Sequence, residues 1–140
     1  MNVSHRDIKP ENIIYDSRTG VAKIIDFGFA CVSKEKLKVF CGTPSFMSPE
    51  IVGKSSYSGP ASDVWACGIL LYTMLAGTVP FKATTEKDLF RKIQKGVYST
   101  PEGLTAGVKT LIKCMLCVDE DHRPRAEEIL EECAWLRGSE

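Results

Sequence analysis

The sequence predicts a mainly α-helical fold of the α+β class, a bundle of helices around one buried helix with a small β-hairpin near the N-terminus. An uninterrupted apolar run at residues 63–77 predicts the buried helix. Apolar residues at helical spacing in the second half of the chain predict further helices. Two short segments of β-forming residues around a turn cluster predict the hairpin. With 140 residues, the chain is expected to form one domain at most.

The hairpin is predicted from residues 13–15 and 21–25, which read as short strands because they are rich in isoleucine and other β-forming residues. Residues 16–20, Asp-Ser-Arg-Thr-Gly, lie between them and have the composition of a turn. Because a hairpin brings its two ends together, Asn12 and Asp26 should return to the same side of the molecule.

The run at residues 63–77 is apolar on every side, which is typical of a helix that is buried in a core or spans a membrane. It is shorter than the ~20 apolar residues that a bilayer requires, and Pro80 follows closely. The run is therefore predicted to be a core helix. Ser62 or Asp63 can cap its start, and Gly77 suits its end.

Three more helices are expected. Thr85 with Asp88 makes a start that is similar to a capping box, and this segment should end near Lys95 and Gly96. Two apolar stripes with helical spacing follow and are predicted to pack into the core. The first stripe is Val108, Leu111, Ile112, Met115 and Leu116, and the second is Ala126, Ile129, Leu130 and Cys133.

Composition argues against several classes of partner. Lys plus Arg and Asp plus Glu each number 18, so the formal net charge is zero, and no long basic or acidic block occurs. Neither a nucleic acid nor an anionic membrane is therefore an expected partner. The pattern of a secretory signal peptide is not recognised at the N-terminus, and no internal repeat is seen.

Six cysteines lie at positions 31, 41, 67, 114, 117 and 133. Cys114 and Cys117 have the CxxC spacing of some metal and redox sites. A structural zinc site needs four ligands, however, and no second close pair of ligands occurs in the sequence. Buried, reduced thiols are predicted instead, which indicates a cytoplasmic or nuclear compartment.

Residues 5–12, His-Arg-Asp-Ile-Lys-Pro-Glu-Asn, and residues 26–28, Asp-Phe-Gly, carry the candidate chemistry. Phosphoryl transfer needs an oriented nucleophile and positive charge held against the phosphates. Asp7 could accept or orient the proton of an attacking hydroxyl, and Lys9 could bind a phosphate. Asn12 and Asp26 offer oxygen atoms, which are the hard ligands that suit Mg²⁺. The pattern therefore favours phosphoryl transfer.

In these residues the chain resembles the large, C-terminal lobe of a eukaryotic protein kinase of the serine/threonine type. Cys-Gly-Thr-Pro at residues 41–44 resembles calcium/calmodulin-dependent and AMP-activated kinases. The resemblance implies transfer of the γ-phosphate of ATP, with Mg²⁺, to a serine or threonine hydroxyl of a protein substrate. It implies that Asp7 and Lys9 are catalytic, that Lys9, Asn12 and Asp26 bind the nucleotide, and that Asn12 and Asp26 hold the metal. Asp-Phe-Gly alone is a common turn tripeptide, so the eight-residue match is the stronger signal.

Two further motifs resemble the end of a kinase activation segment, Gly-Thr-Pro at residues 42–44 and Ser-Pro-Glu at residues 48–50. Ser48 stands where the family usually has alanine. The resemblance implies that Thr43 contacts the catalytic aspartate and helps form the floor for the substrate. It also implies that Glu50 forms a buried ion pair with Arg123, and that Asp63 hydrogen-bonds the catalytic loop from below.

The resemblance makes residues 26–50 the activation segment. Val39 occupies the position of the usual phosphorylated threonine, so Arg6, which clamps that phosphate in the family, would lack its usual partner. Activation is therefore expected not to use phosphorylation at position 39. Ser33 and Thr43 remain as hydroxyls, and Glu35 could supply a fixed negative charge.

The small lobe of a kinase is expected to be absent, because no Gly-x-Gly-x-x-Gly motif occurs and no strand with a phosphate-binding lysine precedes residue 5. Residues 1–140 are then a partial kinase domain that could require a separately supplied small lobe or a regulatory protein. Weak electrostatic stabilisation at an open, wet surface makes activity of the chain alone doubtful. The chain alone is also expected to be loosely folded or poorly soluble. The alternatives are a non-catalytic module that binds and titrates the partners of an intact kinase, and a purely structural helical module.

Overall fold

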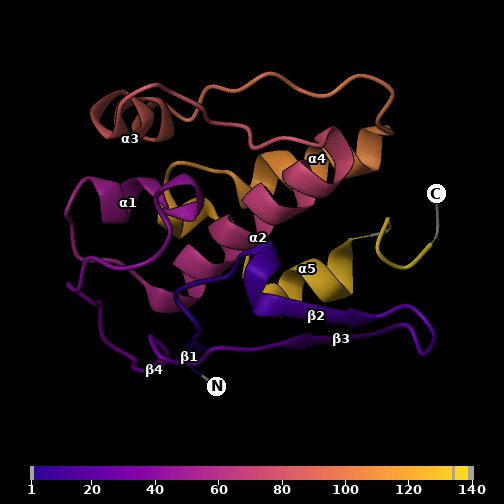
Figure 1. Cartoon of the computed structure of the whole chain (residues 1–140), viewed down its shortest axis with the longest axis horizontal. Helices are drawn as coiled ribbons and strands as arrows, with labels where there is room; N and C mark the ends of the chain where they lie inside the picture. The colour runs from indigo at the N-terminus through magenta and orange to yellow at the C-terminus, as the bar shows by residue number, and fades with distance from the viewer. Residues whose placement is uncertain (1, 134, 139–140) are drawn as a thin grey trace.

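The computed structural model describes residues 2–133 and 135–138, and it shows a mainly helical fold with two small antiparallel sheets (Figure 1). The strands are β1 (Val3–Ser4), β2 (Ile13–Asp16), β3 (Val21–Ile24) and β4 (Cys31–Val32). The α-helices are α1 (Pro49–Val52), α2 (Gly59–Ala76), α3 (Glu86–Lys95), α4 (Ala106–Met115) and α5 (Ala126–Glu132). Short 3-10 helices are η1 (Pro10–Asn12), η2 (Pro44–Phe46) and η3 (Glu120–His122).

The predicted hairpin is confirmed to within one residue at each strand end. Strands β2 and β3 pair from Ile13 opposite Ile24 to Asp16 opposite Val21, and a bond from the Gly20 amide to the Asp16 carbonyl closes the turn at 2.8 Å. The Ile25 amide then donates to the Asn12 carbonyl at 2.9 Å, one step beyond the ladder. The hairpin therefore brings the backbone at residues 12 and 25 together, as the turn cluster predicts.

Helix α2 begins at Gly59, so the prediction that Ser62 or Asp63 caps its start is wrong. The Ser58 hydroxyl accepts a hydrogen bond from the Ala61 amide and provides the cap. A Cβ at Gly59 would clash with the Ser4 hydroxyl oxygen, so strand β1 can approach the first turn only because this residue is glycine. At the other end Gly77 adopts a left-handed conformation with φ 71°, as predicted for a helix C-terminus.

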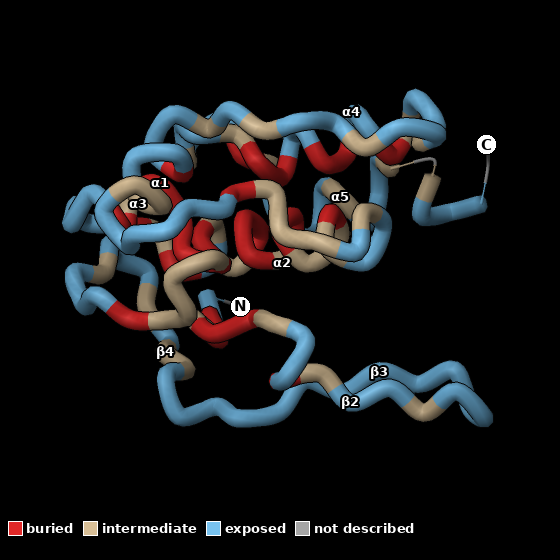
Figure 2. The backbone as a smooth tube through the Cα atoms, turned by 45° about the horizontal axis from the view of Figure 1, so that its top comes forward, coloured by how far each residue is buried: buried red, intermediate tan, exposed pale blue. Residues whose placement is uncertain are grey.

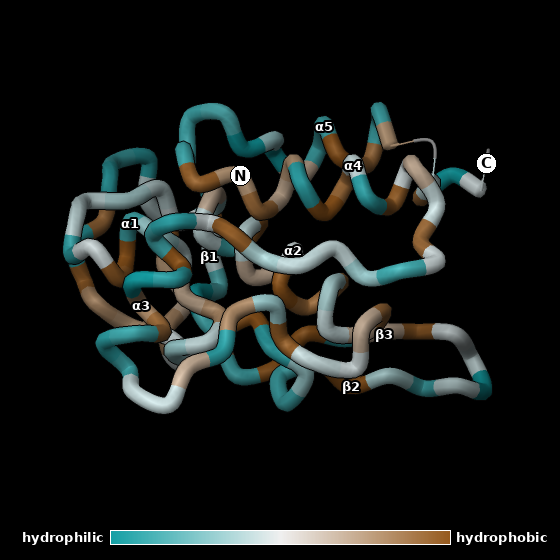
Figure 3. Tube along the Cα trace, turned by 90° about the horizontal axis from the view of Figure 1, so that it is seen from above, coloured by the Kyte–Doolittle hydropathy of each residue, from teal (hydrophilic) through white to brown (hydrophobic). Residues whose placement is uncertain are grey.

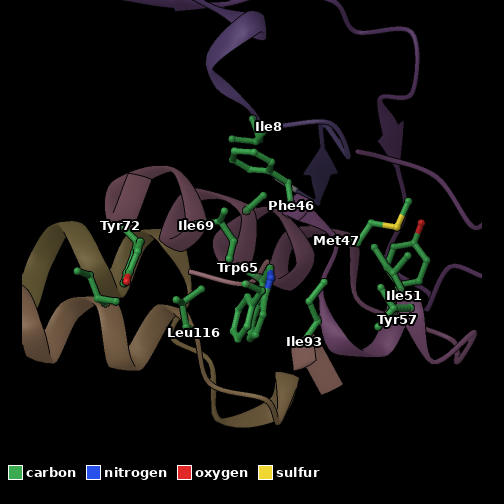
Figure 4. Close-up of a cluster of buried hydrophobic side chains, with 14 of the residues drawn as sticks. Ile8, Phe46, Met47, Ile51, Tyr57, Trp65, Ile69, Tyr72, Ile93 and Leu116 are labelled. Atoms are coloured by element: carbon green, nitrogen blue, oxygen red, sulfur yellow. The ribbon is translucent and has the colours of Figure 1, made fainter. Parts of the chain in front are cut away.

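The hydrophobic core is built on α2. Trp65 and Ile69 are 0% exposed, and Figure 4 shows them in the middle of a cluster that reaches Ile8 on one side and Leu116 on the other. Figure 2 shows buried residues concentrated along α2. The predicted core helix is confirmed, although its apolar run is not buried throughout, because Met74 near its C-terminus is 68% exposed.

The first apolar stripe packs as predicted. Figure 3 shows hydrophobic and hydrophilic residues alternating along α4 and α5, and all five members of the α4 stripe are buried. A side chain at Gly68 of α2 would meet the Met115 Cβ at 2.9 Å and the Leu116 Cδ2 at 2.8 Å. The two helices therefore pack closely at this glycine.

The second stripe is only partly buried, and the prediction that it packs into the core is wrong for two members. Ile129 and Cys133 are half-buried against Val64, Leu111 and Met115, whereas Ala126 and Leu130 are exposed. Helical spacing indicates which residues share a face of a helix, but it does not indicate how wide the contact with a neighbouring helix will be.

The helix predicted from Thr85 to Lys95 is confirmed as α3. Thr85 caps it by accepting from the Asp88 amide at 3.2 Å, and Gly96 ends it with φ 63°.

The prediction that the cysteines are buried holds for some of them but not for all. Cys41 is buried, but Cys114 on α4 is exposed, so the prediction of buried thiols is wrong there. Over the residues that the structure describes, no helix has the length and apolar character needed to cross a membrane.

Candidate functional site

The candidate catalytic loop, residues 5–12, runs from β1 through η1 and is held from below by one carboxylate of α2. The His5 and Arg6 amides donate to the two Asp63 carboxylate oxygens at 2.6 and 2.8 Å. Arg6 has φ 67°, a left-handed conformation that is uncommon for a residue with a side chain, and it lets two consecutive amides face the same carboxylate. Asp63 therefore fixes the backbone directly before Asp7.

Burial raises the pKa of Asp63, while the His5 and Arg6 amides act in the opposite direction. The desolvation cost of this carboxylate is thus partly offset by two hydrogen bonds from the loop. His5 also links the loop to the end of the hairpin. Its ring Nε2 lies 2.8 Å from the Ile25 carbonyl oxygen, and the ring packs edge-on against Phe27 at 5.0 Å between centroids.

Four candidate residues form one hydrogen-bonded cluster around Asp7, which is itself buried. The Thr43 hydroxyl donates to Asp7 Oδ1 at 2.9 Å, and Lys9 Nζ donates to the Thr43 hydroxyl at 2.9 Å. Lys9 Nζ also lies 3.4 Å from Asp7 Oδ2. The Asn12 amide nitrogen donates to the Asp7 carbonyl at 2.8 Å and to Asp7 Oδ2 at 3.2 Å. A carboxylate, an ammonium, a hydroxyl and an amide are thus brought together from residues 7–12 and from the activation segment.

Asp26 is not joined to this cluster by a side-chain hydrogen bond. It lies directly after Ile25, whose backbone pairs with Asn12, but its own carboxylate is exposed and accepts from the Gly28 amide at 3.2 Å. Its φ of 59° is left-handed, like that of Arg6. The backbone therefore brings Asp26 next to the cluster, whereas its side chain makes a local contact.

The activation segment reaches the loop at Gly42. Its φ is 114°, and a Cβ there would lie 3.2 Å from the Arg6 carbonyl oxygen, so glycine allows the segment to pass close to the loop. A cavity of about 20 Å³ remains between this segment, the loop and α2. It has room for a single water molecule, so a larger ligand would have to bind on the outer face of the loop.

Glu50 of α1 and Arg123 form a buried bidentate ion pair. Nη1 and Nη2 of Arg123 donate to the two Glu50 oxygens at 2.8 and 3.0 Å. The Arg123 side chain is 0% exposed, and its Cζ lies 5.2 Å from the centre of the Trp65 ring. The pair ties the end of the activation segment to the loop after η3.

Arg6 is engaged by neutral groups. Its Nε donates to the Phe29 carbonyl at 2.6 Å, and its Nη1 donates to the Tyr57 hydroxyl at 3.4 Å. Partial burial opposes its charge, but the hydrogen bond to Tyr57 helps to raise the net pKa of Arg6. The Glu35 backbone forms a local turn with the Ser33 hydroxyl, and a fixed negative charge from the Glu35 carboxylate stays a prediction.

Two residues near the site carry no motif, so the sequence did not single them out. Tyr57 lies between the activation segment and α2. Glu120 of η3 accepts from Lys36 Nζ at 2.5 Å and from the Ser58 amide at 2.9 Å. A tyrosine and a glutamate of this kind are found only when the fold brings distant segments together, because their spacing to the catalytic loop has no fixed pattern.

The donor set of the site suits a hard cation. The Asn12 side chain makes both of its bonds through Nδ2, which leaves its side-chain oxygen Oδ1 for another partner, and Asp26 has an exposed carboxylate. Carboxylate and amide oxygens are the ligands that Mg²⁺ prefers. Among residues 2–133 and 135–138, no group of three or more His, Cys, Asp or Glu side chains could hold a metal ion by itself. A cation here would therefore need oxygen atoms from a ligand as well.

A helical fold with this loop and this polar cluster is that of a protein kinase domain, and the family model for that domain matches residues 1–135. The chain is 43% identical over 129 residues to sucrose non-fermenting protein kinase 1 of Fusarium virguliforme, covering 91% of this chain and 18% of that protein. It is 44% identical over 131 residues to serine/threonine protein kinase OSK3 of Oryza sativa subsp. indica, covering 92% of this chain and 26% of that protein. Probable serine/threonine-protein kinase HSL1 of Saccharomyces cerevisiae is 42% identical over 132 residues, covering 93% of this chain and 9% of that protein.

The chain belongs to the protein kinase family. Its relatives are serine/threonine kinases related to the sucrose non-fermenting and AMP-activated kinases, which confirms the family and branch predicted from residues 5–12 and 26–28. The chain spans about a quarter or less of the length of these relatives.

Proposed function

We propose that this chain provides the large-lobe part of the active site of a serine/threonine protein kinase. In this proposal the γ-phosphate of ATP is transferred to a serine or threonine hydroxyl of a protein substrate. The observation that carries the proposal is the hydrogen-bonded cluster of Asp7, Lys9, Asn12 and Thr43. It holds a carboxylate and an ammonium side by side beside residue 43 of the activation segment.

Asp7 would orient the acceptor hydroxyl and take its proton. The carboxylate accepts bonds from Thr43 and Asn12, so its position is fixed before a substrate arrives. Lys9 would place positive charge against the transferred phosphate, where preorganised charge has its largest effect. Thr43, which bonds both of these residues, would set the distance between the base and the substrate-binding segment.

Asn12 and Asp26 would hold Mg²⁺ through oxygen atoms, and the bound ion would neutralise negative charge on the ATP phosphates. Asp26 would have to turn from the Gly28 amide toward the nucleotide. Its exposed position leaves room for that movement. The other side of the nucleotide cleft would come from a small lobe, either in the same longer protein or as a separate chain. A cytoplasmic or nuclear location stays a prediction.

The proposal is tested by magnesium-dependent ATP binding and phosphate transfer to a serine-containing peptide. Asp7→Asn should lower the transfer rate by about 10²- to 10⁴-fold without weakening ATP binding, because it removes only the base. Asp26→Ala should weaken ATP binding in the presence of Mg²⁺, because it removes a metal ligand. Asp16→Asn, an equivalent change at the end of β2 next to the hairpin turn, serves as the control and should alter neither quantity.

A second candidate is a non-catalytic module that binds the partners or substrates of an intact kinase. The local hydrogen bond of Asp26 favours it, because a side chain that bonds its own backbone is not preorganised for a metal. ATP binding that is weak or undetectable, and that Asp26→Ala leaves unchanged, would favour this candidate over the enzyme.

A further inference from the structure

We propose that Tyr57 is a positioning residue whose hydroxyl holds the activation segment against the catalytic loop, at the place where other kinases of this type use a phosphate. The proposal concerns regulation of the same site and so rests on the proposed function. Its first test does not require catalytic activity.

Tyr57 is placed by the backbone as well as by its ring. Its amide donates to the Leu37 carbonyl at 2.9 Å, and its carbonyl accepts from the Leu37 amide at 2.7 Å. The two residues form an isolated antiparallel bridge between the activation segment and the segment that leads into α2. Tyr57 is 1% exposed, so its hydroxyl must find partners inside the protein.

The Tyr57 hydroxyl contacts both the catalytic loop and the activation segment. It donates to the Val39 carbonyl at 2.8 Å, accepts from Arg6 Nη1 at 3.4 Å, and lies 3.8 Å from Cys41 Sγ. The Tyr57 hydroxyl thus donates to residue 39 and accepts from the catalytic loop, and it also lies beside residue 41. The Tyr57 hydroxyl and the Arg6 guanidinium together complete the link.

The position of this link explains why it can replace a phosphate. Position 39, where the family resemblance places a phosphorylated threonine, has valine and contributes its backbone carbonyl to the Tyr57 hydroxyl. Arg6, which would clamp that phosphate, donates instead to the same hydroxyl. The contact between Arg6 and residue 39 is therefore kept through Tyr57 and does not depend on phosphorylation.

A second link fixes the segment nearby. Lys36 forms an ion pair with Glu120, and the other oxygen of Glu120 accepts from the Ser58 amide at the start of α2. The pair holds residue 36, whereas the Tyr57 hydroxyl holds residue 39. Loss of the hydroxyl should therefore loosen the segment between residue 39 and the Thr43 contact, while residue 36 stays attached.

The alternative is that Tyr57 serves only as an apolar ring in the core, and Tyr57→Phe separates the two roles because it keeps the ring and removes the hydroxyl. Tyr72→Phe is the matched control. Tyr72 is also buried, and its hydroxyl also donates to a backbone carbonyl, that of Ser99 at 2.7 Å, but it lies away from the activation segment. Circular dichroism checks that both variants fold.

The first measurement is the rate at which iodoacetamide labels Cys41, which is buried beside the hydroxyl. Mass spectrometry follows this thiol, together with tryptic cleavage after Lys38. Tyr57→Phe should raise both rates about tenfold, since a hydrogen bond of this kind shifts an opening equilibrium by about that factor. Tyr72→Phe should leave both rates unchanged. Equal rates in Tyr57→Phe and the control would overturn the proposal.

Two further arms complete the test. Arg6→Gln removes the bond from Arg6 to the Tyr57 hydroxyl, together with the bond from Arg6 Nε to the Phe29 carbonyl, and should also raise the labelling rate. In a kinase assay, Tyr57→Phe should raise KM for the peptide substrate several-fold while KM for ATP stays the same. If no phosphate is transferred even when a small lobe is supplied, the proposed function is rejected, but the labelling result still decides the role of Tyr57.

Discussion

Ser48 has a buried side-chain hydroxyl that its surroundings do not satisfy. Its side chain is 0% exposed, and its hydroxyl is one of two buried side-chain polar atoms without a hydrogen-bond partner among the described residues, the other being Trp65 Nε1. Ser48 occupies the N-cap position of α1, yet its side chain makes no capping bond. A buried hydroxyl without a partner costs free energy that an alanine would not.

Ser48→Ala should therefore increase the free energy of unfolding by about 1 kcal/mol. Urea denaturation followed by circular dichroism measures the difference. Ser62→Ala is the matched control, because the Ser62 hydroxyl is also buried but donates to the Gly59 carbonyl at 2.7 Å. That variant should lose stability, and a gain in Ser62→Ala equal to that in Ser48→Ala would contradict the explanation.

The buried thiol of Cys67 in α2 should lower the stability of the fold in alkaline solution. Burial, together with the negative charge of Asp63, raises the pKa of Cys67 from 9.0 to about 11. The pKa of the Cys67 thiol is higher in the folded chain than in the unfolded one. Its contribution to the free energy of unfolding is therefore fully present below pH 9 and is lost as the pH rises toward 11. By pH 10 the folded protein should have lost about 1.4 kcal/mol from this group.

The measurement is urea denaturation at pH 8, 9 and 10 of the natural protein and of Cys67→Ala. The difference in unfolding free energy between the two should shrink by about 1.4 kcal/mol between pH 8 and pH 10. Other groups titrate in this range in both proteins and cancel in the difference. A difference that does not change with pH would show that the Cys67 thiol ionises as readily in the folded chain as in the unfolded one.

At this scale, the sequence identifies residues whose chemistry is fixed by a short motif. Asp7, Lys9 and Asn12 lie within six residues of one another, so any fold that preserves the loop keeps them close. Tyr57 could not be found in this way. Its partners Arg6 and Val39 are 51 and 18 residues away in the chain, and only the packed fold brings the three together.

Between elements, the strongest polar contact joins α1 to the loop after η3. Arg123 uses all of its N–H groups: Nε donates to the Cys117 carbonyl, Nη1 to Glu50 and the Ala61 carbonyl, and Nη2 to Glu50 and the Val118 carbonyl. A guanidinium has five such donors in a fixed plane, and an ammonium cannot reproduce that geometry. The contact therefore depends on arginine in particular.

Arg123→Lys should lower the free energy of unfolding by about 3–5 kcal/mol, because it leaves backbone carbonyls and part of the Glu50 carboxylate buried without donors. Thermal or urea denaturation measures the loss. Arg125→Lys is the control, since the Arg125 side chain is 75% exposed and its ion pair with Glu127 is long, at 3.7 Å. Its effect should stay within about 0.5 kcal/mol. Similar effects of the two substitutions would contradict a special role for Arg123.

The elements themselves were predictable to different degrees. Helix α3 and the hairpin follow from local signals, a cap at Thr85 and a turn cluster at residues 16–20, and both are found where those signals place them. The start of α2 was not predictable from its apolar run, because Ser58 caps a first turn that contains Gly59 and Pro60. The burial of α5 was not predictable either, because it depends on how far the neighbouring helix extends.

In the whole molecule, the hairpin stands out from the body of the fold. Figures 1 and 2 show β2 and β3 extending away from the helices, with their residues largely exposed. Large apolar side chains on this hairpin are nonetheless exposed, among them Ile14, Tyr15, Val21 and Ile24. A group of such residues on one projecting element, unlike a single exposed residue, favours self-association.

This exposed hairpin gives a physical reason for the expected poor solubility of the chain, and it can be tested by Ile14→Thr with Ile24→Thr. Threonine keeps the β-branched shape that suits a strand but removes apolar surface. The double variant should raise the protein concentration at which light scattering begins and should lower the binding of a hydrophobic dye. Met74→Gln, which replaces one exposed apolar side chain on α2, should change neither quantity much, since scattered exposed apolar residues are common on protein surfaces. Dye binding that stays the same in the double variant would mean that the hairpin is not the apolar surface that drives self-association. The apolar residues of the activation segment, such as Phe40, would then be the next to substitute, because they too are exposed.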